Sequence, residues 1–131
     1  GDFIIYGSIA GSVLAPHFGP YGATKAATNA LVEVLIHENL NSKVRFLLVK
    51  PPMVNTPLIN QATGSSNPKT VQEGVAKKRF DAPQAIVDAI EKAIEKGVKI
   101  LYPDGESKFL SVWRRYAPRL LWKVILKSEG L

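Results

Sequence analysis

Tyr21 and Lys25 are the two residues of this sequence whose types and spacing best suit acid–base chemistry. If the segment is helical, residues four apart lie on one face, so the phenol and the ammonium can point into the same cleft. A free tyrosine has a pKa of about 10, and a neighbouring cation stabilises its anion, which brings proton exchange closer to neutral pH. The pair can therefore serve as a proton shuttle. The alternative is that Tyr21 packs in the core at the start of a helix.

Two further residues are predicted to lie beside this pair. Ser8 stands 13 residues before Tyr21, after an apolar run over 3–6, and Pro51 follows a second apolar run over 44–49. Short, uninterrupted apolar runs indicate strands that are buried on both faces of a parallel sheet. The functional crevice of such a sheet lies at the carboxyl ends of its strands. Ser8, Pro51 and the entry to the Tyr21 helix are therefore expected to converge there.

The elements that must position these residues alternate along the chain. Strands are predicted at 3–6, 44–49 and 98–102, and helices at 21–38 and 82–96. This order is typical of parallel crossovers, so the predicted fold class is α/β. The sheet is expected to be a partial doubly wound, Rossmann-like sheet of about three strands, with flanking helices and a basic helical tail. The segment 53–80 is predicted to be a long loop with one short helix, as in a lid or binding loop.

Local signals mark the two main helices. The first has Leu31, Val34 and Leu35 on one apolar stripe. The second is bracketed by Asp81, which offers an N-cap, and by Gly97, which offers the residue just past the helix end.

Composition excludes several kinds of site. The 131 residues contain no cysteine, so a disulfide framework and a thiolate metal site are both excluded. Neither His17 nor His37 is expected to bind a metal. His17 either lines the predicted crevice or lies on the surface, and His37 is expected on the surface near a helix end. No run of about 18 uncharged apolar residues occurs, which argues against a transmembrane span, and the protein is expected to be cytoplasmic.

The net charge of +6 is concentrated at the C-terminus. Residues 1–106 hold 11 basic and 10 acidic side chains, whereas residues 107–131 hold six basic side chains and one acidic side chain, Glu129. We therefore divide the chain into a unit over 1–106 and an amphipathic tail over 107–131, in which Pro118 separates two short helices. The tail either packs on its own domain or a twin subunit, or it lies on an anionic membrane surface as a peripheral contact. Nucleic acid is not an expected partner.

Three short motifs together resemble the short-chain dehydrogenase/reductase family. In chain order they are Ser8-x-Ala10-Gly11, Tyr21-x-x-x-Lys25 and Pro51-x-x-Val54-x-Thr56. With the later unit of helix, glycine and strand, the resemblance covers residues 2–103. It implies the C-terminal, catalytic half of an oxidoreductase that transfers hydride between a nicotinamide and a small carbonyl or alcohol substrate. The implied cofactor is NAD or NADP, and the implied assembly is a homo-oligomer.

The resemblance also implies roles for individual residues. Tyr21 would be the general acid/base, Ser8 would hold the substrate carbonyl or hydroxyl, and Lys25 would bind the nicotinamide ribose and ease ionisation of Tyr21.

Further along the chain, the resemblance implies a cofactor contact and a substrate loop. Pro51, Val54 through its backbone, and Thr56 would lie against the cofactor, and residues 57–80 would form the mobile substrate loop.

The sequence departs from the family pattern at Ile5, Gly7 and Pro52, where the family often has Asn, Ser and Gly. The 131 residues contain no G-x-G-x-x-G, so the resemblance places the dinucleotide-binding half upstream of Gly1. We therefore expect a piece of a longer chain whose strands are the fifth, sixth and seventh of the full sheet. Alone, this piece is predicted to be inactive and to self-associate through the exposed edge of its first strand.

The loop carries the apolar residues Met53, Leu58 and Ile59, which favour a lipophilic substrate. The alternative to an enzyme is a non-catalytic fold module that serves dimerisation or membrane-surface docking.

Overall fold

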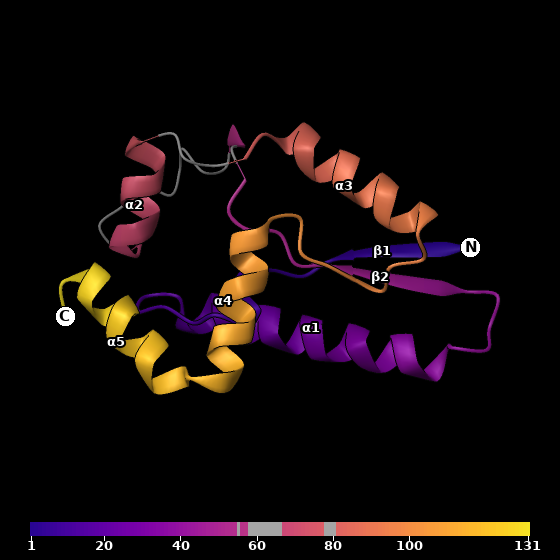
Figure 1. The fold of residues 1–131 in the computed structure, drawn as a ribbon, viewed down its shortest axis with the longest axis horizontal. Coiled ribbons are helices and arrows are strands. Elements are labelled where there is room, and N and C mark those ends of the chain that lie inside the picture. The colour runs from indigo at the N-terminus through magenta and orange to yellow at the C-terminus, as the bar shows by residue number, and fades with distance from the viewer. Residues whose placement is uncertain (55, 58–66, 78–80) are drawn as a thin grey trace.

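A computed structural model describes residues 1–54, 56–57, 67–77 and 81–131 (Figure 1). Its elements in chain order are β1 (Asp2–Tyr6), the 3-10 turn η1 (Ile9–Gly11), α1 (Gly19–Glu38), β2 (Arg45–Val49), α2 (Lys69–Ala76), α3 (Pro83–Glu95), β3 (Ile100–Leu101), α4 (Gly105–Tyr116) and α5 (Pro118–Glu129). The predicted strands and main helices are therefore confirmed, with small differences at their ends, and so is the α/β class.

β1, β2 and β3 form one parallel sheet in that order. Successive side chains of a strand point to opposite faces, so β2 presents one apolar set to each side. Leu48 packs with Val32 and Ile36 of α1, whereas Leu47 and Val49 pack with α3. Figure 1 shows α1 and α3 on opposite sides of the sheet. This layering agrees with the predicted Rossmann-like arrangement and places the core on both faces of β2.

β1 is less buried than the sequence predicts. Phe3 and Tyr6 are each more than half exposed, and only Ile5 is partly buried, against the core beneath α1. The physical reason is that β1 lies at the edge of the described sheet and pairs with β2 alone. Phe3 stacks on Phe46, with 5.4 Å between the ring centroids. The prediction of a strand buried on both faces is therefore wrong for β1, and its apolar edge is exposed.

The buried face of α1 also differs from the predicted stripe. Leu31 and Val34 are more than half exposed, and Leu35 is only partly buried. The positions that are buried are Gly22, Asn29, Val32 and Ile36. Because five of the six residues over 31–36 are apolar, hydropathy does not decide which side of this helix meets the sheet. Contacts near the start of the helix decide it instead.

One of the two predicted boundaries of α3 is confirmed. Gly97, with φ at 66°, follows the last turn of the helix as expected. Asp81 is not the N-cap, because Ala82 occupies that position without a side-chain hydrogen bond, and Pro83 is the first helical residue. Asp81 instead forms a parallel bridge with Val54, which ties the loop after β2 to the start of α3.

The tail forms two helices, and Pro118 begins the second, as predicted. The Asp104 carboxylate accepts a hydrogen bond from the Ser107 backbone N–H at 2.8 Å and so caps α4. α5 contacts both α4 and α2, with Leu121 fully buried (Figure 1). In the part of the chain that the structure describes, no helix combines the length and the apolar character needed to cross a membrane.

We expect Val49→Ala to lower the free energy of unfolding by about 1 to 3 kcal/mol, because Val49 is fully buried against α3 and its lost methyl groups leave a cavity. Val87→Ala makes the same change at an exposed position of α3 and should alter stability by less than about 0.5 kcal/mol. Urea unfolding followed by circular dichroism measures both. Equal losses in the two variants would contradict the packing described for β2.

Candidate active site

A cavity of about 530 Å³ opens at the carboxyl ends of β1 and β2. The loop after β1, the start of α1 and the loop after β2 provide most of its lining. The lining residues are Ser8, Ile9, His17, Phe18, Pro20, Tyr21, Pro52, Met53, Val54, Thr56 and Asn67. Of the six residues predicted to form the site, Ser8, Tyr21, Val54 and Thr56 therefore meet in one space. It lies where open parallel α/β sheets bind ligands.

Ser8 is held by the turn that follows β1. It is buried, and its Oγ accepts a hydrogen bond from the Ala10 backbone N–H at 3.1 Å, at the start of η1. The Ile9 N–H donates to the Pro51 carbonyl at 3.2 Å, which joins the loops after β1 and β2. Because Oγ acts only as an acceptor toward Ala10, the hydroxyl hydrogen of Ser8 is left to donate to a ligand.

Asn29 positions this turn, and the sequence reasoning missed it. Its Nδ2 donates to the Ser8 carbonyl at 3.1 Å, and the residue is buried between α1 and the turn. α1 therefore holds the Ser8 turn directly. The signal that could have found Asn29 is a polar residue one helical turn after Lys25, in a helix whose next seven residues are mostly apolar.

Two glycines permit the close approach of this turn to α1. A Cβ at Gly7 would overlap with the Asn29 side chain. A Cβ at Gly11 would lie 2.6 Å from the Lys25 carbonyl carbon and 2.7 Å from the Ala26 nitrogen, which are backbone atoms of α1. Asn29 thus fills the space that a side chain at position 7 would need, which accounts for glycine where the resembled family often has serine.

Tyr21 and Lys25 lie together near the start of α1, as their spacing predicts. Lys25 Nζ is 5.9 Å from the centroid of the Tyr21 ring and donates to the Tyr6 carbonyl at 3.5 Å. The Tyr21 ring packs against Phe18, with 5.3 Å between centroids, yet the residue is 46% exposed. The alternative of a tyrosine packed in the core is therefore wrong. Lys25 lies between the end of β1 and the phenol and does not itself line the cavity.

The loop after β2 forms another wall of the cavity. Val54 and Thr56 line it, and so does Pro52, whereas Pro51 contributes through its carbonyl, which accepts the Ile9 N–H. Val54 also packs against the core beneath α3. The predicted apolar contributors Leu58 and Ile59 lie outside the described residues, and α2 is the described helix within the predicted substrate loop.

His17 adds an imidazole to the cavity lining, which was one of the two expectations for it. Its backbone has φ at 68°, a left-handed conformation that few residues other than glycine adopt. His37 is exposed in the last turn of α1, as expected.

Lys50 is a second residue that sequence reasoning missed. It is only 5% exposed, and its Nζ forms an ion pair with Glu33 of α1 at 2.9 Å and lies 5.6 Å from the centroid of the Tyr102 ring. A buried ammonium without a partner is strongly unfavourable, so this pair constrains where the end of β2 meets α1. No pattern in the sequence marks it, because a lysine that follows an apolar strand usually extends into water.

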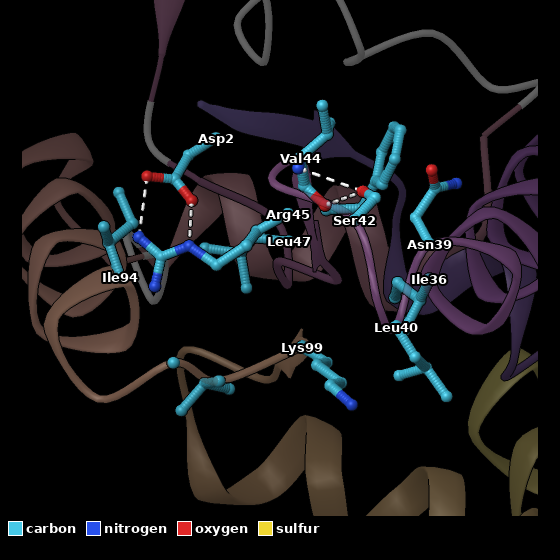
Figure 2. A pocket seen from close by; sticks show the side chains of 13 residues that line it. Asp2, Ile36, Asn39, Leu40, Ser42, Val44, Arg45, Leu47, Ile94 and Lys99 are labelled. Atoms are coloured by element: carbon cyan, nitrogen blue, oxygen red, sulfur yellow. Dashed lines mark hydrogen bonds and ion pairs between the residues drawn. The ribbon is translucent and has the colours of Figure 1, made fainter.

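A smaller cavity of about 210 Å³ lies at the opposite end of the sheet, between the C-terminal part of α1 and the start of β2 (Figure 2). There the Arg45 guanidinium binds both carboxylate oxygens of Asp2, at 2.6 and 2.9 Å. The hydrogen bond from Arg45 lowers the pKa of the Asp2 carboxyl below its usual value. Because this groove lies at the amino ends of β1 and β2, it is separate from the cavity that holds Ser8 and Tyr21.

Comparisons with known sequences find a matching family model and similar proteins. The family model for short chain dehydrogenase matches residues 1–67. The uncharacterized oxidoreductase YbbO of Escherichia coli K12 is 28% identical over 105 residues, which are 79% of this chain and 39% of that protein. The uncharacterized oxidoreductase Rv1543 of Mycobacterium tuberculosis H37Rv is 36% identical over 63 residues, which are 48% of this chain and 18% of that protein.

Two solved structures share the fold. A short chain dehydrogenase from Burkholderia cenocepacia, in complex with NADP, matches with a TM-score of 0.75 and 21% identity, over 96% of this chain and 49% of that one. A short chain dehydrogenase/reductase from Burkholderia phymatum, in complex with NAD, matches with a TM-score of 0.70 and 19% identity, over 92% and 48%. The chain thus spans less than half the length of each of these relatives.

We expect Gly11→Ala to lower the free energy of unfolding by about 1 to 3 kcal/mol, because the added Cβ meets the backbone of α1, which cannot move without shifting the helix. Gly105→Ala adds the same methyl group where nothing lies within 4 Å, and it should change stability by less than about 0.5 kcal/mol. Thermal unfolding by calorimetry compares the two. A Gly11→Ala variant as stable as the Gly105→Ala variant would rule out the close approach.

Proposed function

Because the chain belongs to the short-chain dehydrogenase/reductase family, we propose that it carries the acid–base site of an oxidoreductase that interconverts a carbonyl and an alcohol. One observation carries the proposal. The Ser8 hydroxyl and the Tyr21 phenol line the same cavity at the carboxyl ends of the strands, and the Lys25 ammonium stands beside the Tyr21 ring. A hydrogen-bond donor and an acid–base group thereby line one space that a small substrate can enter, and a cation lies next to the acid–base group.

In this proposal Tyr21 exchanges the proton. Its phenol donates a proton to the substrate oxygen during reduction and accepts one from the substrate hydroxyl during oxidation. Lys25 Nζ, 5.9 Å from the ring centroid, supplies positive charge near the ring as negative charge develops on the phenolate. The Ser8 hydroxyl, whose oxygen is oriented by the Ala10 N–H, donates a hydrogen bond to the same substrate oxygen.

The residues around the cavity fit the nicotinamide end of NAD or NADP. The Val54 backbone and the Thr56 hydroxyl offer polar groups on the wall formed by the loop after β2, and Lys25 offers an ammonium to a ribose hydroxyl. Pro51, held through its carbonyl by Ile9, keeps this loop in place. When bound, the cofactor supplies or accepts the hydride. The NADP and NAD complexes of the two similar structures support this assignment.

The chemistry of the walls favours a lipophilic substrate. Phe18, Met53 and Val54 contribute apolar side chains to the cavity beside the Ser8 hydroxyl. A small carbonyl or alcohol compound with an apolar remainder would meet both the Ser8 hydroxyl and these apolar side chains.

We assign residues 1–106 to the catalytic half of a Rossmann-like domain and residues 107–131 to a separate tail. The 131 residues contain no G-x-G-x-x-G, and the matches cover 39%, 49% and 48% of the relatives' own lengths. The rest of the cofactor site is therefore assigned to a part of the protein outside residues 1–131.

The exposed side of α1 supports a homo-oligomer. Ala27, Leu31 and Val34 follow one another at spacings of four and three on this side of the helix and are all exposed. An identical helix packed against them would bury this apolar row. The same surface also supports the alternative function, a non-catalytic module that serves dimerisation. Binding of NAD or NADP by the full-length protein separates the two, because only the enzyme requires it.

In the full-length protein, Tyr21→Phe should lower kcat by about a hundredfold to ten-thousandfold, because it removes the hydroxyl that exchanges the proton. The affinity for NAD(P)H, measured by fluorescence titration, should change little. Tyr116→Phe removes a hydroxyl from an exposed ring on α4 and should leave kcat unchanged. A Tyr21→Phe enzyme with normal turnover would remove Tyr21 from the mechanism.

Residues 1–131 produced alone should neither bind NAD(P)H tightly nor turn it over, and they should self-associate through the exposed edge of β1. Isothermal calorimetry and analytical ultracentrifugation measure these properties. A stable monomer that reduces a carbonyl compound with added NAD(P)H would show that the 131 residues already contain a complete cofactor site.

A further inference from the structure

The surface of α4 carries an exposed aromatic row. Phe109 and Tyr116 are 62% and 78% exposed, and Val112 between them is exposed as well. Residues three and four apart share a helix face, so these three side chains form one row. Lys108 and Arg115 are also exposed and lie next to this row on the helix. α4 therefore presents large apolar side chains with cations beside them, and Glu106 is an exposed acidic residue in its first turn.

α5 continues the same kind of surface directly after Ala117. Arg119, Lys123 and Lys127 lie four residues apart, form a basic row along the helix and are all exposed. Leu120 and Val124, each about half exposed, form an apolar row beside it. Both helices thus combine apolar side chains with a basic border, the pattern of helices that lie in a membrane interface.

The positive charge of this surface is not neutralised within the described part of the chain. None of the six basic side chains of residues 107–131 forms an ion pair with a described residue, since the ion pairs there join Asp2 to Arg45, Glu33 to Lys50 and Glu73 to Lys77. No ion pair of these cations therefore holds the described fold together. They remain available to a partner that carries negative charge.

The acidic residue of the tail, Glu129, faces the interior instead. It is buried, and its carboxylate accepts hydrogen bonds from the Thr70 hydroxyl at 2.8 Å and from the backbone N–H groups of Lys69 and Thr70 at the start of α2. Burial raises the pKa of Glu129, but the hydrogen bonds from Thr70 and Lys69, together with the nearby His17, lower it by more. α5 is thereby anchored through its acidic residue, and its basic row is held outward.

We propose that the exposed surface of α4 and α5 docks on an anionic phospholipid membrane. The aromatic and aliphatic rows would enter the interface between head groups and acyl chains, while the arginine and lysine side chains would reach the lipid phosphates. This inference goes beyond the proposed enzymatic function and does not depend on it.

The charge and the apolar rows select this partner over two others. A second copy of the tail would bring two surfaces of the same sign together, which opposes association. A nucleic acid would satisfy the cations but would leave Val112, Leu120 and Val124 against a phosphate backbone, where aliphatic side chains gain nothing. An anionic bilayer can bind the basic side chains through its phosphates and the apolar side chains through its acyl chains at the same time.

The test is vesicle co-sedimentation of the full-length protein. Vesicles of equal parts phosphatidylcholine and phosphatidylglycerol should bind the protein at least about tenfold more strongly than pure phosphatidylcholine vesicles. Changing Arg119, Lys123 and Lys127 together to glutamine should lower binding to the anionic vesicles at least about tenfold. The matched control changes three exposed lysines, Lys92, Lys96 and Lys99, to glutamine and should bind nearly as well as the wild type.

Two further measurements keep the result specific. The two tryptophans of residues 1–131, Trp113 and Trp122, both lie in the tail. A blue shift in the tryptophan fluorescence of the full-length protein on anionic vesicles should therefore accompany binding and vanish in the glutamine triple variant of α5. Tyr21→Phe, which tests the enzymatic proposal, should bind vesicles like the wild type. Equal loss of binding in both triple variants, or an oligomer in lipid-free buffer that only the α5 variant dissociates, would overturn the membrane assignment.

Discussion

The close approach of the β1 turn to α1 is the contact on which the candidate site depends. Gly11 meets the backbone of α1 with no room for a Cβ, and Asn29 reaches from the same helix to the Ser8 carbonyl. Together these contacts determine the rotation of α1 about its axis and the place of Ser8. Once the helix is held in this rotation, Tyr21 lies at the cavity and Lys25 lies between the phenol and the end of β1. These two contacts therefore position all three residues proposed for the chemistry.

The opposite wall of the cavity rests on a different interaction. Lys50 directly follows β2 as a buried cation, and it contacts Glu33 on α1 and the Tyr102 ring after β3. Because the Glu33 side chain is 45% exposed, water weakens the attraction, but loss of the carboxylate would still leave an ammonium in a nearly dry position. The loop that starts at Pro51 is thus tied to α1 through Lys50 and to the β1 turn through Ile9. The cavity keeps its shape because the loops that form both walls are held against the same helix, α1.

The body and the tail use their charged residues differently. In the body, Lys50, Arg45 and Lys77 each pair with a carboxylate of the fold. In the tail, the Glu129 carboxylate is buried and accepts hydrogen bonds at the start of α2. None of the six basic side chains of the tail has an ion-pair partner among the described residues. The uneven charge of the sequence therefore corresponds to a difference in ion pairing between the body and the tail. Two ion pairs of the body, Asp2–Arg45 and Glu33–Lys50, join different elements, whereas the basic side chains of the tail form an outward surface that an anionic partner can use.

The sequence by itself determined the order of strands and helices, because apolar runs, glycines and prolines act locally. It also determined that Tyr21 and Lys25 share a face, because residues four apart lie on the same side of a helix. It did not determine which face of α1 is buried, since apolar residues surround the helix at 31–36, nor the exposure of β1, which depends on what lies beyond its edge. The roles of Asn29 and Lys50 were decided only by the tertiary structure. Asn29 acts through a hydrogen bond and Lys50 through an ion pair, and each joins segments that are far apart in the chain. The free-energy cost of leaving either group unpaired depends on its burial, which no local sequence pattern shows.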